Sequence, residues 1–185
     1  MEVSDQQSKV TGLIVDLISS RLGADKGVHP MTAIISSARI TGSILLRSCD
    51  LKLEIYEPGS VLLSPEVNEK GPQLINILGH MLNNFGVTID QSKLKTEKGE
   101  DSKLTYIETM NLFQNDVLDI IQTHKLSFEE GAQAIAISTA FIVKECASNT
   151  GAEAGFNAAL YGFVEGSKTV PPYLTTNKKP WYKVW

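Results

Sequence analysis

One segment, residues 128–147 with the sequence FEEGAQAIAISTAFIVKECA, constrains the fold more than any other part of the chain. Read as a helix, its middle carries apolar or small residues on every side. Such a helix either crosses a membrane or lies at the centre of a bundle. Charged residues such as Glu130 and Lys144 stand near its two ends, so the uncharged run is too short to span a bilayer. The segment therefore predicts a buried central helix.

Composition sets the class of protein around that helix. The chain has 185 residues, of which 42% are hydrophobic and 21% are charged, which suits one globular domain. A net charge of −4 argues against nucleic-acid binding. Residues 1–10 lack the basic start and apolar run of a signal peptide, which favours a cytoplasmic protein. The two cysteines lie in apolar helical runs, where they form neither a disulfide framework nor a zinc motif.

Hydrophobic residues recur at helical spacing in five further segments, so a six-helix bundle is predicted. Capping boxes, which mark helix starts, begin at Ser4, Ser127 and Thr150. The six helices form a mainly α domain over residues 1–168, followed by an extended tail over 169–185. The five further helices are predicted at about 5–22, 30–49, 72–85, 104–124 and 151–166.

The stretch between the second and third predicted helices has a different period. Leu51, Leu53 and Ile55 alternate with polar residues, and Pro58-Gly59 suits a turn. A small β-hairpin insertion is therefore predicted at about 51–63, with residues 86–89 as a candidate third strand. Gly71-Pro72 is expected to interrupt a helical turn that starts near Pro65, and residues 91–103 read as a mobile charged loop.

Two of the helical segments resemble each other. Residues 39–49 (RITGSILLRSC) align without a gap on 136–146 (AISTAFIVKEC), and each follows an amphipathic helix. One hypothesis is that two three-helix halves pack with pseudo-twofold symmetry around these two helices. The other is that apolar helices simply look alike.

The second predicted helix carries a polar stripe, formed by Ser36, Arg39, Ser43 and Arg47 at one side. Guanidinium groups bind carboxylates and phosphates well, so the stripe is a candidate site for an anionic ligand or a partner's carboxylates. The alternative is a solvated face on which Arg47 pairs with Asp50.

His80, on the third helix, is grouped with Arg39, Ser43 and Arg47 as a candidate ligand or partner contact. Its alternative role is that of a solvated surface residue.

None of the three histidines has a second ligand at metal-binding spacing, so neither a metal nor another cofactor is predicted. The chain contains no nucleophile elbow and no phosphate-binding glycine loop. The sequence therefore favours a non-enzymatic protein.

Three helices are dense in small residues, which predicts closely packed partner helices, mainly within the chain. The last helix is apolar around much of its circumference, and the tail is basic and aromatic. Together they suggest a homodimer, in which the tail docks either on its own chain or on a neighbour. The candidate interface residues are Phe156, Leu160, Phe163, Trp181, Tyr182 and Trp185.

Two functions remain open. The first is a helical interaction or scaffold protein, and the second is a regulatory protein that binds a small molecule in an apolar pocket between the central helices. We expect a hollow of ~300 Å³ or more, with apolar walls and a few polar groups, in the ligand-binding case. A solid core with a large exposed apolar patch would favour the interaction role. An enzyme would need several perturbed ionisable groups in one cleft.

Overall fold

The computed structural model describes residues 3–23, 27–94 and 102–174. These residues are mainly helical, as the hydrophobic periodicity predicts. No helix among them combines the length and apolar character needed to cross a membrane. The elements are α1 (Asp5–Leu22), α2 (Pro30–Arg47), η1 (Leu53–Ile55), α3 (Pro65–Asn84), η2 (Gln91–Lys93), α4 (Tyr106–Thr123), α5 (Phe128–Thr150) and α6 (Ala152–Lys168).

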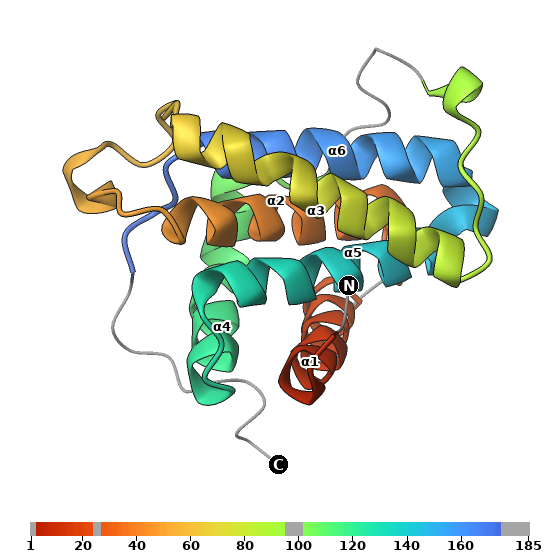
Figure 1. The fold of residues 1–185 in the computed structure, drawn as a ribbon, viewed down its shortest axis with the longest axis horizontal. Coiled ribbons are helices and arrows are strands. Elements are labelled where there is room, and N and C mark those ends of the chain that lie inside the picture. The colour runs from red at the N-terminus through yellow and green to blue at the C-terminus, as the bar shows by residue number, and fades with distance from the viewer. Residues whose placement is uncertain (1–2, 24–26, 95–101, 175–185) are drawn as a thin grey trace.

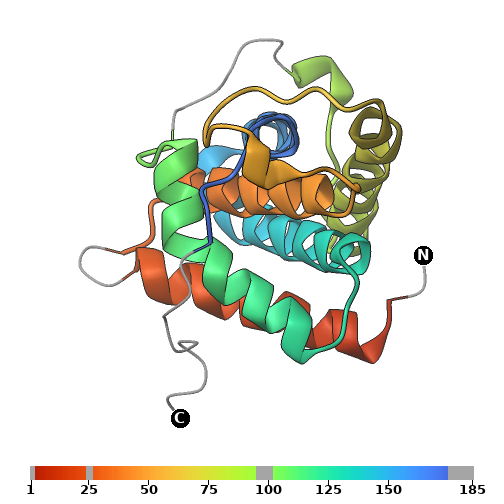
Figure 2. The same ribbon diagram turned by 90° about the vertical axis from the view of Figure 1, so that its left-hand side faces the viewer.

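The six α-helices form three layers. α2 and α5 lie side by side in the middle layer, with α3 and α6 on one side of them and α1 and α4 on the other (Figure 1). The view turned by 90° shows that α1 and α4 run across the central pair (Figure 2). α2 packs mainly on α6 and α5, while α5 packs on α2, α3 and α1. The middle layer therefore has neighbours on both faces.

α2 is the most enclosed helix of the bundle. Every residue from Met31 to Leu46 is buried, including the hydroxyl residues and Arg39. α5 is buried through most of its middle but leaves Phe141, Lys144 and Glu145 exposed. The prediction of a buried helix at 128–147 agrees with the middle of α5. Helix α2 lies at the centre together with α5. The polar residues of α2 had predicted a helix with one solvated face.

Glycines allow α2 and α6 to approach closely. A Cβ atom added at Gly42 would lie 2.4 Å from the Phe163 carbonyl oxygen, and one at Gly166 would lie 2.1 Å from the Arg39 carbonyl oxygen. Real Cβ atoms do not come so near to backbone atoms, so only glycine fits at these two positions. The small residues of α2 and α6 therefore serve packing within the chain, as their density predicts.

A buried hydroxyl cluster joins α2 to α5. The Ser37 and Thr139 hydroxyls lie 2.8 Å apart, and the Thr41 hydroxyl donates to the Ser37 carbonyl at 2.9 Å. Thr139 also donates to the carbonyl of Ile135. Each hydroxyl has a partner, which removes most of the cost of burying it.

The predicted β-hairpin at 51–63 is wrong. In the described residues this stretch contains the 3₁₀-helix η1, and Val61 forms an isolated antiparallel bridge with Thr169, just after α6. Leu62 N–H donates to the Lys168 carbonyl at 2.8 Å, and Val170 N–H donates to the Ser60 carbonyl at 2.9 Å. Residues 59–62 thus share backbone hydrogen bonds with a segment more than a hundred residues away, which local alternation does not reveal, whereas residues 51–56 bond locally. Residues 86–89 are likewise not a strand.

Two local predictions are also wrong. α3 continues from Pro65 through Gly71 and Pro72, although an interruption was expected there. Proline removes the N–H that would reach Asn68, but both residues are exposed, so water can satisfy the free carbonyl. The capping box predicted at Thr150 is absent, because Thr150 ends α5 and its hydroxyl donates to the Cys146 carbonyl. The boxes at Ser4 and Ser127 are confirmed.

Candidate functional site

Three of the four polar residues in the α2 stripe are buried. Ser36, Arg39 and Ser43 are each no more than 4% exposed, so the predicted solvated face does not exist. Helix α6 covers this side of α2, with the start of α4 beside it. Arg47, in the last turn of α2, is half-buried. The two arginines of the stripe therefore lie in different surroundings.

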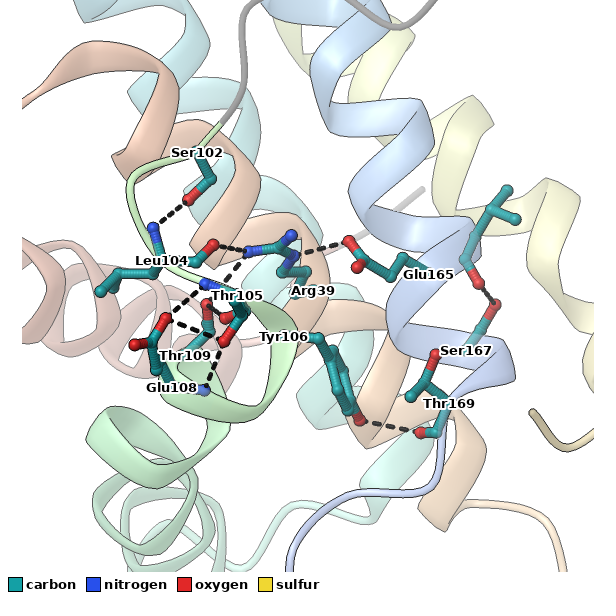
Figure 3. A network of polar contacts seen from close by, with 11 residues as sticks. Arg39, Ser102, Leu104, Thr105, Tyr106, Glu108, Thr109, Glu165, Ser167 and Thr169 are labelled. Atoms are coloured by element: carbon teal, nitrogen blue, oxygen red, sulfur yellow. Dashed lines mark hydrogen bonds and ion pairs between the residues drawn. The ribbon is translucent and has the colours of Figure 1, made fainter. Parts of the chain in front are cut away.

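Arg39 is held inside the bundle by three groups (Figure 3). Its Nε donates to the Glu165 carboxylate on α6 at 2.7 Å, and Nη1 donates to the Leu104 carbonyl at 2.5 Å and to the Thr109 hydroxyl at 3.3 Å. Glu165 supplies the opposite charge that a buried guanidinium requires. Arg39 thus ties α2, α6 and the start of α4 together, and these contacts leave it unsuited to a ligand.

Tyr106 anchors the segment that follows α6. Its hydroxyl donates to the Thr169 carbonyl at 2.8 Å, as Figure 3 shows. Burial, opposed by a contact with Ser43 and the charge of Arg47, raises the pKa of Tyr106 to about 12. The phenol therefore stays protonated at neutral pH and acts as a hydrogen-bond donor.

Arg47 has no carboxylate partner within the described residues. Its Nη2 donates to Oε1 of Gln114 at 3.2 Å, and Nε2 of Gln114 donates to the Pro172 carbonyl at 3.2 Å. The predicted pair with Asp50 does not form. Burial lowers the pKa of the Arg47 guanidinium, although arginine keeps its charge at neutral pH. Arg47 is therefore a half-buried cation whose side-chain hydrogen-bond partner, among the described residues, is a neutral amide.

A hollow of about 760 Å³ opens beside Arg47. It lies where the end of α2 meets α4 and the start of α5, and it is bounded on one side by the segment that follows α6. Its walls are mainly apolar, with a few polar groups from Arg47, Ser48, Gln122, Ser127 and Glu129. The apolar wall consists of Leu118, Ile121, Leu126, Phe128 and Leu174.

A second hollow of about 270 Å³ shares Arg47 and Leu174 with the first. Leu53, Glu54 and the residues from Pro171 to Tyr173 complete its lining. Tyr173 donates from its hydroxyl to the Tyr56 carbonyl at 3.4 Å, which holds this wall to the loop after α2. Arg47 therefore stands between two hollows of different size.

The other predicted site residues do not gather at Arg47. His80 is exposed on α3, while Phe156 and Phe163 are buried within the bundle and Leu160 is partly buried. The three aromatic residues predicted for the interface, Trp181, Tyr182 and Trp185, lie outside the described residues. So does most of the predicted loop at 91–103. Sequence reasoning singled out Arg47 but missed Gln114 and the apolar wall from α4, because nothing local links them to α2.

Nothing in the described part of the chain groups three or more His, Cys, Asp or Glu side chains in a way that could hold a metal ion. Both described cysteines are free thiols, and burial raises the pKa of Cys49 and of Cys146. A raised pKa keeps a thiol protonated and unreactive at neutral pH.

No protein-family model, curated protein or solved structure matches this chain.

Proposed function

We propose that this protein binds a small apolar molecule in the hollow between α2, α4 and α5. The hollow itself carries the proposal, because about 760 Å³ is within the usual range for ligand pockets. Leucine, isoleucine and phenylalanine side chains supply most of its wall, and a few polar groups converge on it. This combination is the one expected in the ligand-binding case, and it favours that function over an interaction or scaffold role. The site lies at one end of the central helices, beside Arg47, which is one of the four candidate ligand contacts predicted from the sequence.

A neutral fluorescent probe tests this proposal. N-phenyl-1-naphthylamine gains fluorescence when it leaves water for an apolar site, so titration with the protein should give a saturable increase with one site per chain. Leu118→Trp would fill part of the hollow and should lower the affinity at least about tenfold, since each 1.4 kcal/mol of lost binding changes affinity by that factor. Gln6→Trp, on an exposed position of α1, is the matched control.

Equal binding by the wild type and Leu118→Trp would contradict the proposal. Thermal melting of both variants should be recorded first, so that unfolding is not mistaken for a blocked hollow. Retained binding in Gln6→Trp, together with loss in Leu118→Trp, would locate the probe.

A second proposal is the homodimer. It is supported by exposed apolar side chains on the segment before α3 and on α6, where Val61 is 74% exposed, Leu63 68% and Val164 48%. The bridge between Val61 and Thr169 holds that segment beside the end of α6. Clustered exposed apolar groups are typical of interaction surfaces. Sedimentation analysis of the wild type and of Leu63→Glu tests it: a dimer that dissociates in the variant supports it, and a monomeric wild type contradicts it. The interface role of the tail and the cytoplasmic location remain predictions.

We also propose that the bundle consists of two related halves. The support is that equivalent helices of the two halves, α1–α3 and α4–α6, make equivalent contacts with the other half. α6 packs on α2 as α3 packs on α5, and α4 packs on α2 as α1 packs on α5. Superposition of α1–α3 on α4–α6 tests the proposal, and opposed helix directions would contradict it.

A further inference from the structure

We infer that the ligand of this hollow carries an anionic group, such as a carboxylate or sulfonate, and that Arg47 binds it. The inference deepens the proposed function and rests on it. An apolar molecule with one anionic group would place its apolar body against the α4 and α5 side chains and its charge at the guanidinium.

The contacts of Arg47 carry the inference. A half-buried guanidinium has lost part of its hydration, and a neutral amide oxygen restores less than a carboxylate would. Arg47 contacts Gln114 Oε1 at 3.2 Å and has no ion pair in the described part of the chain. An anion placed in the hollow would supply the missing opposite charge.

The acidic residues nearby do not neutralise this charge. Glu129 lines the larger hollow, but its carboxylate accepts a hydrogen bond from Lys70 Nζ at 2.9 Å. Glu54 lines the smaller hollow and is exposed, and it forms no ion pair with Arg47. Lys70, which also contacts Glu66 at 3.6 Å, therefore pairs with Glu129 in place of Arg47. Arg47 is the one cationic side chain among the described residues that line the larger hollow, and it has no carboxylate partner there.

Arg39, in the same helix, is an arginine whose charge and hydrogen-bond donors have partners within the chain. It donates to a carboxylate, a carbonyl and a hydroxyl, and it is 4% exposed. Arg47, two turns further along α2, lines two hollows instead. The fold therefore uses Arg39 for structure and leaves Arg47 facing open space that a ligand can fill.

A pair of probes with the same apolar body tests the inference. N-phenyl-1-naphthylamine is neutral, whereas 8-anilino-1-naphthalenesulfonate adds a sulfonate to the same ring system. Arg47→Met should weaken the sulfonate probe about tenfold or more, since hydrogen bonds to charged groups contribute substantially to binding, and should leave the neutral probe within about twofold. Arg47→Lys keeps the charge and should recover part of the loss. Lys9→Met removes the same charge from an exposed position on α1 that does not line the hollow, and it should change neither probe.

Each failure has a distinct pattern. If neither probe binds the wild type in a manner sensitive to Leu118→Trp, the proposed function itself is wrong. If both probes bind there but Arg47→Met leaves the sulfonate probe unchanged, the hollow is a ligand site and the anionic inference is overturned. An equal loss for both probes in Arg47→Met would mean that Arg47 shapes the hollow without selecting charge, which also overturns it. If Lys9→Met and Arg47→Met have different melting temperatures, binding is measured well below both temperatures, so that both variants are folded.

Discussion

Helices α2 and α5 form the middle layer together, yet they are buried in different ways. α5 has the more continuous apolar sequence, but it leaves Phe141 and Lys144 exposed. α2 contains an arginine and several hydroxyl residues, and it is buried at every position from Met31 to Leu46. Apolar character alone therefore does not decide which helix is most enclosed.

The difference comes from what packs on each helix. Glycines let the backbone of α6 lie directly against α2, and Glu165 on α6 supplies the charge that Arg39 needs. Where α6 meets α5, Gly155 instead faces the Val143 side chain, with Ile34 of α2 nearby. A close backbone contact with matched polar groups can thus bury a polar helix more completely than an apolar one.

The largest effect is expected from Gly166→Ala. The added Cβ would meet backbone atoms of Arg39 at 2.1 Å, so α6 must move away from α2, with an expected loss of about 3 kcal/mol in the free energy of unfolding. Gly155→Ala on the same helix would meet side-chain methyls at 3.2 and 3.3 Å and should cost much less. Urea denaturation of both variants measures the difference, and equal losses would show that the α2 contact is not special.

The second largest effect is expected from Arg39, whose replacement should destabilise the fold more than that of Arg47. Arg39→Met leaves Glu165 and the Leu104 carbonyl without their partner, and a loss of about 2 kcal/mol is expected, moderated because Glu165 is partly exposed. Arg47→Met breaks only the contact with Gln114 and should change the unfolding free energy by less than about 1 kcal/mol. Similar losses in denaturation experiments would contradict the division between a structural and a ligand-facing arginine.

Tyr106, which packs beside α2, should make the stability of the fold depend on pH in the alkaline range. Its folded pKa of about 12 lies above the unfolded value of about 10, so the folded state holds the proton more tightly. The associated stability is fully present below about pH 10 and is lost as the pH rises towards 12. Melting temperatures from pH 8 to 12 should fall more steeply for the wild type than for Tyr106→Phe. Parallel curves would show that this phenol does not control alkaline unfolding.

The smallest effect is expected where α2 meets α5. Thr139→Val keeps the shape of the side chain but leaves the Ser37 hydroxyl without its partner, at a cost of about 1 kcal/mol. Thr11→Val removes the hydrogen bond that the half-buried Thr11 hydroxyl on α1 donates to the Ala134 carbonyl on α5, so it is a matched change where an outer helix meets the middle layer. A larger loss for Thr11→Val would mean that the central hydroxyl contact matters less than its burial suggests.

Much of the local structure could be predicted from the sequence. Helical periodicity located the helices to within a few residues, except for the start of α3, and the boxes at Ser4 and Ser127 identified two helix starts. These signals work because helix formation and capping depend on residues three or four positions apart. The hairpin prediction at 51–63 failed because the first half of the stretch bonds locally and residues 59–62 bond to 168–170, which no local pattern specifies.

Only the tertiary structure decided how the polar residues of α2 are used. Arg39 and Arg47 look equivalent in the sequence, since both belong to one stripe on one helix. Their different roles depend on Glu165 in α6 and Gln114 in α4, which reach α2 only when the bundle has packed. The hollow has the same origin, because its walls come from segments separated by up to about 130 residues. The sequence by itself determined the helices and marked Arg47 as a candidate, while the packing of distant helices decided that it faces a space large enough for a ligand.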